Sequence, residues 1–183
     1  VAQYDESQYP DWKWFEDILT YDNAVLPHAM FVAWLTLRKD RYLDVAKNTC
    51  RFLLDCTFTG QHFSFIGCNG WYERGGTKAR FDQQPLEAVA TVLMLRAAYD
   101  ATQDGQYLSL QRKAFDWFLG RNDIHKVVAD LHTGGCQDGL QGSGVNKNQG
   151  AESTIAWLTA LHLAHIHSVA ASTVKNEQPS IGQ

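Results

Sequence analysis

The pattern of hydrophobic and polar positions predicts pairs of helices, in which an apolar helix is followed each time by an amphipathic one. Residues 22–39 contain Pro27 in the first turns and are then apolar on nearly all faces, which is typical of a buried helix. Residues 41–57 place apolar and charged side chains on opposite faces, so we expect a half-exposed helix there. The same order returns at 84–102 and 106–119.

A third apolar helix is predicted at 150–171, with no outer helix after it, and a further short helix at 12–19. Residues 172–183 have no hydrophobic periodicity, and we expect a disordered tail there. The predicted fold is therefore all-α, with one domain over residues 1–171. Because the chain begins at Val1 rather than Met, the sequence leaves open that this domain is a fragment of a longer chain.

The three apolar helices begin with similar polar strings, about 60 to 70 residues apart, which indicates a divergent internal repeat. Repeated helix pairs are typical of solenoids and closed toroids. Solenoids use short connections, whereas 58–80 and 121–147 are long, glycine-rich loops of the kind that often carries function. Residues 62–66 alternate as a short strand does, before a turn at Asn69 and Gly70. We expect little other β structure, at most a short β-hairpin.

Carboxylic acids at the starts of the apolar helices are the candidates for catalysis. Glu87 and Glu152 lie one turn into apolar helices, where partial burial would raise the carboxyl pKa as a general acid requires. Asp22, Asp82 and Asp138 lie nearer the loops, where solvation would keep them ionised. Paired carboxyls with separated pKa values carry out glycoside hydrolysis, so Glu152 or Glu87 is the predicted acid and Asp82 or Asp22 the base. Helix capping is the alternative role for each.

Other polar and aromatic residues near these carboxyls suit the hydroxyls and rings of a sugar. Trp71 and Tyr72 offer flat faces and Arg74 a fork of donors, although a Trp that closes the core beneath a loop is an equally good interpretation. The predicted substrate-binding residues are Asn23, His28, Trp71, Tyr72, Arg74, Gln83, Gln84, Asp138, Asn148, Gln149 and Ser153.

Composition excludes several classes of protein. The 183 residues are 45% hydrophobic and 12% aromatic, which is enough for a packed core. The net charge is −4 and the 16 Lys and Arg are scattered, so no nucleic-acid partner is predicted. The longest apolar runs are far shorter than the roughly 20 residues of a membrane span. The four cysteines form no CxxC pair and no leader opens the chain, so we expect reduced thiols in a cytoplasmic protein.

Neither a metal nor another cofactor is predicted. His132, Cys136 and Asp138 have a spacing that matches no familiar metal site. Residues 70–78 lack the GK-Ser/Thr order of a phosphate loop, and three histidines within 162–167 lack the glutamate of a zinc-protease helix.

Six strings of the sequence together resemble a known family. They are YDNAVLPHA, IGCNGWYERGG, FDQQPLEA, WFLGRND, TGGCQDGL and NQGAEST. The chain resembles, over roughly 12–167, the α/α-toroid domain found in bacteria and archaea, alone or fused behind a retaining-type glycosyltransferase domain and related in architecture to six-hairpin glycosidases. A complete ring has twelve helices, so the resemblance implies a partial toroid. It also implies a carbohydrate-related role, with these matching positions: Asp22, Asn23, Trp71, Tyr72, Arg74, Asp82, Gln83, Gln84, Glu87, Asp138, Asn148, Glu152 and Ser153.

Three hypotheses follow for function. The leading one is a glycoside hydrolase-like domain that binds a saccharide and cleaves it with two carboxyls. The second is a non-catalytic module that holds glycan or docks a glycosyltransferase domain. The third is an epimerase or isomerase of amino sugars, which needs a base on each face of the ring and has only His28 and His62 in suitable places.

Overall fold

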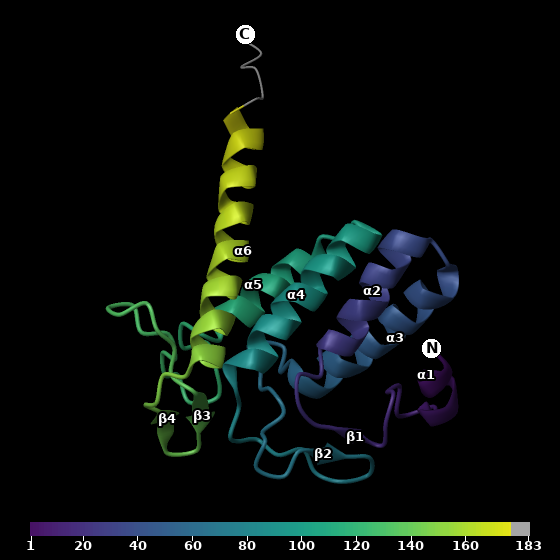
Figure 1. Cartoon of the computed structure of the whole chain (residues 1–183), viewed down its shortest axis with the longest axis horizontal. Coiled ribbons are helices and arrows are strands. Elements are labelled where there is room, and N and C mark those ends of the chain that lie inside the picture. Colours follow the sequence, from purple (N-terminus) through teal and green to yellow (C-terminus); the bar gives the residue numbers. More distant parts are fainter. Residues whose placement is uncertain (177–183) are drawn as a thin grey trace.

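The protein, seen here in a computed structural model, is mostly helical (Figure 1). The structure describes residues 1–176, and within them the predicted mainly α fold is confirmed. The helices are α1 (Ala2–Ser7), α2 (Val25–Leu37), α3 (Asp40–Thr57), α4 (Pro85–Thr102), α5 (Gln106–Asp116) and α6 (Ala151–Asn176).

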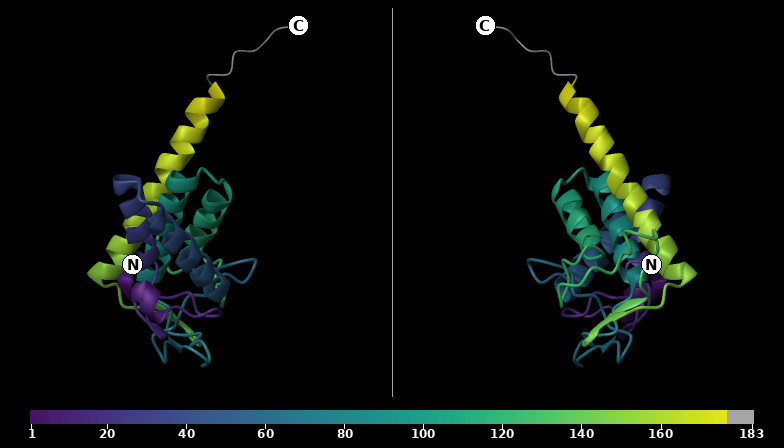
Figure 2. Two further views of the ribbon diagram at one scale, coloured as in Figure 1. Left: turned by 90° about the vertical axis from the view of Figure 1, so that its right-hand side faces the viewer. Right: turned by 90° about the vertical axis from the view of Figure 1, so that its left-hand side faces the viewer.

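Helix α4 lies at the centre and packs against α2, α3, α5 and α6. Its alanine-rich sequence is apolar on nearly all faces, and eleven of its residues are buried. α2 and α6 flank α4, while α3 packs mainly on α2, and α5 on α4 and α6. The amino ends of α2, α4 and α6 all lie at the lower end of Figure 1, where the long loops also gather (Figures 1 and 2). Polar residues at the starts of these helices are therefore neighbours.

The amphipathic helices behave as predicted. α3 buries a stripe that includes Val45, Thr49 and Leu53, and leaves Asp44 and Lys47 exposed. This one-sided burial is what a helix with a separate polar face produces when it covers a core from outside.

The predicted burial of α2 is wrong, and the apolar helix α6 is also partly exposed. In α2 only Pro27 and Phe31 are buried, and Val32 is 44% exposed. In α6, Ile155 is 63% and Leu158 48% exposed. An apolar helix is buried on all sides only if neighbours surround it, as they do α4; α2 and α6 lie at the two edges of the layer, and an apolar pattern does not reveal how many neighbours a helix has.

The helix predicted at 12–19 is also wrong. The segment consists of bends and ends in the two-residue strand β1 (Ile18–Leu19), which pairs antiparallel with β2 (Tyr72–Glu73). Trp12 and Trp14 are buried and their rings pack against Phe52 of α3. The path of this segment is determined by the burial of its aromatic side chains against the core and not by helical periodicity.

The predicted strand at 62–66 is wrong as well, apart from a single bridge between Phe58 and Phe63. The segment is nearly all buried. Its backbone hydrogen bonds go to Thr57, to Thr59 and to the side chains of Gln83 and Lys78 instead of to one neighbouring strand. A hairpin forms later, from β3 (Gly139–Gln141) and β4 (Gly144–Asn146). The described residues therefore contain two short antiparallel pairs, one more than predicted.

Helix α6 continues to Asn176, past the predicted end at Ala171. Residues 172–176 contain no Gly or Pro that would stop a helix. The rest of the predicted tail, 177–183, lies outside the described residues. Within the described part of the chain, none of the helices combines the length and the apolar character needed to span a lipid bilayer.

Replacing Phe31 by Ala should lower the free energy of unfolding by about 3 to 5 kcal/mol, because it opens a cavity between α2 and the core. Phe31 is 0% exposed and its ring lies 6.5 Å from that of Tyr107. The neighbouring Val32→Ala change, on the exposed face, should cost less than about 1 kcal/mol. Denaturant unfolding followed by tryptophan fluorescence measures both, and equal costs would contradict the assigned faces of α2.

Candidate functional site

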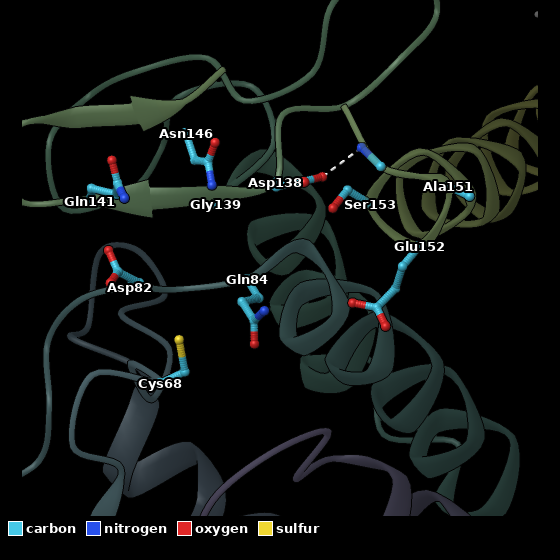
Figure 3. A pocket seen from close by; sticks show the side chains of 11 residues that line it. Cys68, Asp82, Gln84, Asp138, Gly139, Gln141, Asn146, Ala151, Glu152 and Ser153 are labelled. Atoms are coloured by element: carbon cyan, nitrogen blue, oxygen red, sulfur yellow. Dashed lines mark hydrogen bonds between the residues drawn. The ribbon is translucent and has the colours of Figure 1, made fainter. Parts of the chain in front are cut away.

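A cavity of about 410 Å³ lies between the β3–β4 hairpin, the first turn of α6 and the segment before α4 (Figure 3). Its volume is near the lower end of the roughly 300–1,000 Å³ typical of small-molecule pockets. The lining residues are Cys68, Asp82, Gln84, Asp138, Gly139, Gln141, Asn146, Gly150, Ala151, Glu152 and Ser153.

The hairpin is fixed beside α4 by its contact with Gln83. Gln83 and Leu140 exchange two backbone hydrogen bonds, of 3.0 and 2.8 Å. Gly139 permits this approach, since a Cβ at that position would lie 2.8 Å from the Gln83 carbonyl oxygen. The hairpin therefore forms one wall of the pocket while the start of α4 forms another.

Asp138 joins the hairpin to the start of α6. Its Oδ1 accepts a 2.7 Å hydrogen bond from the Gly150 N–H, and its Oδ2 accepts one from the Asn148 side chain. Partial burial opposes ionisation of Asp138, but hydrogen bonds from Gly150, Ser153 and Asn148 outweigh it and lower the carboxyl pKa. Asp138 is thus a fixed carboxylate that caps the start of α6 from the β3–β4 side, 12 residues before Gly150.

Glu152 extends from the first turn of α6 into the pocket (Figure 3). The partial burial predicted for it is wrong, because Glu152 is exposed at the edge of the helix layer. The Tyr21 hydroxyl donates a 2.5 Å hydrogen bond to Glu152 Oε2, which links the turn before α2 to α6. This hydrogen bond is the largest of the causes that raise the pKa of Tyr21 to about 12. Tyr21 therefore stays protonated as a donor that orients the Glu152 carboxyl.

Asp82 and Gln84 occupy the side of the pocket opposite α6. Figure 3 shows Asp82 facing the cavity across from Glu152, with Gln84 between them. Among the described residues, none donates a hydrogen bond to the Asp82 carboxylate. The pocket thus contains three carboxylates, and Asp82 is the one that its own surroundings leave available to a ligand.

A second carboxyl cluster lies beneath the turn that leads into α2. Glu87 is 4% exposed and accepts hydrogen bonds from Asp22 N at 2.5 Å, Asn23 N at 3.4 Å and Asn23 Nδ2 at 3.2 Å. Burial raises the pKa of Glu87 to about 7, although these hydrogen bonds act in the opposite direction. Both Glu87 oxygens are engaged by this turn, and Glu87 does not line the pocket.

Asp22 belongs to the same cluster. It has a left-handed backbone with φ of 53°, a conformation that Asp tolerates better than most residues. Its Oδ1 is buried without a hydrogen-bond partner among the described residues, and burial together with the nearby Glu152 carboxylate raises the pKa of Asp22. The predicted catalytic residues are therefore divided, with Asp82 and Glu152 in the pocket and Asp22 and Glu87 outside its lining.

The loop expected to stack on sugar rings faces another way. The Arg74 guanidinium lies 3.5 Å from the centre of the Tyr9 ring and forms an ion pair with Asp17. Tyr72 packs edge-on against Trp12, and Trp71 is partly buried against the core. Aromatic residues of the amino-terminal segment hold this loop, so Trp71, Tyr72 and Arg74 do not line the pocket.

Gln83 is a core residue and not a residue of the pocket. Its side chain is fully buried, and Oε1 accepts hydrogen bonds from Phe65 N at 3.1 Å and Trp117 Nε1 at 3.0 Å. Its Nε2 donates to Arg80 O and Asp123. All four hydrogen-bonding positions of the amide are thus satisfied within the protein.

Five predicted site residues line the cavity: Asp82, Gln84, Asp138, Glu152 and Ser153. The ten that do not are Asp22, Asn23, His28, Trp71, Tyr72, Arg74, Gln83, Glu87, Asn148 and Gln149. Among these, Asn148 supports Asp138, and Gln149 donates to Asp130 at 2.9 Å. Asn23 bonds to Thr20 as well as Glu87, and burial lowers the pKa of His28.

Sequence reasoning missed several residues of the site, mainly Cys68, Gln141, Asn146 and Tyr21. The pair Gly142–Ser143 between two short alternating segments is a recognisable hairpin signal, and it would have brought Gln141 and Asn146 to the same wall. Nothing in the sequence pattern pairs Tyr21 with Glu152, because 131 positions separate them.

No protein-family model matches this sequence, and no curated protein matches it significantly. Among residues 1–165, His, Cys, Asp and Glu side chains do not gather in threes as ligands of a metal ion would.

Gln83→Leu should lower the free energy of unfolding by about 3 kcal/mol or more, because it leaves the buried Trp117 and Phe65 donors unpaired. Gln84→Leu provides the matched control, since Gln84 precedes α4 without a side-chain capping bond, and it should cost less than about 1 kcal/mol. Denaturant unfolding distinguishes the two variants, and equal losses would contradict a structural role for Gln83.

Stability should fall as the pH rises from about 4.5 to 7, because folded Glu87 keeps its proton up to about pH 7 whereas the unfolded chain releases it near the ordinary value of 4.5. Between these pH values the folded state binds more protons than the unfolded chain. The stabilisation from protonated Glu87 is therefore fully present below about pH 4.5 and is lost by about pH 7. The loss attributable to Glu87 is about 3 kcal/mol. Unfolding curves at several pH values should show it in the wild type and in the exposed control Glu73→Gln, but not in Glu87→Gln. An unchanged pH slope in Glu87→Gln would refute the assignment.

Proposed function

We propose that this chain is a carbohydrate-active domain, glycoside hydrolase-like, that binds a saccharide in the pocket at the amino ends of α4 and α6. The observation that supports this most directly is the pocket itself, whose lining includes the carboxyls of Asp82 and Glu152 from different elements, together with hydroxyl and amide groups. Carboxyls on two sides of a sugar-sized cavity are the arrangement that hydrolysis of a glycosidic bond uses.

The architecture proposed for this function is part of an α/α toroid. In it, α2, α4 and α6 are inner helices and α3 and α5 are outer ones. The proposal is supported by the central position of α4 between α2 and α6, and by the common direction of the three inner helices (Figure 1). The resemblance of the six sequence strings to toroid domains supports it independently.

In the catalytic form of the proposal, Glu152 is the general acid and Asp82 the base or nucleophile. In its protonated form, Glu152 gives the proton to the leaving oxygen as the bond to the anomeric carbon breaks, and it is a carboxylate again afterwards; Asp82 activates a water or attacks that carbon itself. A separation of about 5 Å between the two carboxyls suits a retaining reaction, and about 6.5 to 9.5 Å suits inversion. Asp138, held by three donors, positions Ser153 and the start of α6.

The second candidate is a non-catalytic saccharide-binding module attached to a glycosyltransferase domain. The observation in its favour is that Glu152 and Asp138 are both already held by donors within the protein. The epimerase hypothesis has less support, because neither His28 nor His62 lines the pocket. A cytoplasmic location belongs to the same proposal and is supported by four cysteines that are all free thiols.

Glu152→Gln and Asp82→Asn should each lower turnover of the cleaved saccharide at least about 100-fold, because each removes one partner of the proton transfers. The dissociation constant for the saccharide should stay within about tenfold of the wild-type value, since both replacements keep the shape of the side chain. Reducing-end release from a panel of oligosaccharides measures turnover, calorimetry measures binding, and Glu73→Gln is the control. Equal turnover in wild type and both variants removes the catalytic roles, and binding without turnover in the wild type favours the non-catalytic module.

A further inference from the structure

The charged side chains that line the pocket are all acidic. Three carboxylates line it, from Asp82, Asp138 and Glu152, and no Lys, Arg or His does. The nearest basic residues along the chain are otherwise placed: Arg80 pairs with Asp123, and Lys147 follows Asn146 with an exposed side chain that is not part of the lining. A cavity walled by carboxylates concentrates negative potential and disfavours an anionic ligand.

The uncharged part of the lining points to a ligand rich in hydroxyls. Gln84, Gln141 and Asn146 contribute amides, each of which both donates and accepts hydrogen bonds, and Ser153 contributes a hydroxyl. No Trp, Tyr or Phe lines the cavity, so recognition rests on hydrogen bonds to the edges of a sugar and not on stacking against its face.

From this lining we infer that the pocket selects a saccharide unit that carries no carboxylate, sulfate or phosphate. The inference rests on the proposed saccharide binding and narrows its substrate class. Asp82 contributes most to the selection, because its carboxylate faces the cavity without a donor from the described residues. Asp138 contributes less, since three hydrogen bonds already compensate its charge.

The test uses matched pairs of oligosaccharides: manno-oligosaccharides with oligomannuronates, and galacto-oligosaccharides with oligogalacturonates. Calorimetry with the wild-type chain at low salt should show one neutral series bound and its uronate counterpart at least about tenfold weaker. Raising the salt concentration should narrow that gap, since ions screen charge repulsion. Uronates that bind as tightly as their neutral counterparts, or more tightly, would overturn the inference.

Asp82→Asn removes the charge and keeps the shape, so it should reduce the discrimination between neutral and uronate ligands several-fold. Glu152→Gln tests the opposite wall in the same way. It also provides a second measurement if the Asp82→Asn chain does not fold. Asp44→Asn makes the same change of net charge on the exposed face of α3, a helix that contributes no residue to the pocket lining, and should leave the ratio unchanged. If both pocket variants behave like Asp44→Asn, selection by the pocket is refuted. If no member of any pair binds, the proposed function itself fails, and this inference with it.

Discussion

The buried Glu87 carboxyl holds together the elements on which the pocket depends. It extends from the first turn of α4 and accepts three hydrogen bonds from the Asp22 and Asn23 turn that leads into α2. That turn carries Tyr21, whose hydroxyl reaches Glu152 at the start of α6. One carboxyl and one phenol therefore connect the amino ends of all three apolar helices, although these segments lie far apart in the sequence.

This connection separates the carboxyl that holds the helices together from the carboxyls that line the pocket. Glu87 is enclosed by donors and its raised pKa reflects burial, so its unusual titration is a property of the scaffold. Asp82 and Glu152 face a cavity instead, and they lie on opposite sides of it. A perturbed pKa alone would draw attention to Glu87, whereas the lining of the cavity includes Glu152 and not Glu87.

The helices from α2 to α6 were predictable from the sequence because their periodicity is local, and α3 and α4 agree with prediction within one residue at each end. The starts of α4 and α6 likewise placed Asp82 and Glu152 correctly near one site. The directions of Gln83 and Trp71 were not predictable, because they depend on partners such as Trp117 and the amino-terminal segment that only the folded chain brings near. Exposure of α2 and α6 escaped prediction for the same reason, since burial requires neighbours as well as apolar side chains.

The position at which a sugar binds tests the proposed pocket most directly. A crystal structure of the Asp82→Asn chain soaked with a neutral oligosaccharide measures this, because the variant preserves the shape of the pocket and slows any cleavage. The account predicts a sugar ring between residue 82 and Glu152, with its hydroxyls on Gln84, Gln141 and Asn146. A sugar seated instead against the Trp71 and Arg74 loop, with the pocket occupied only by water, would contradict it.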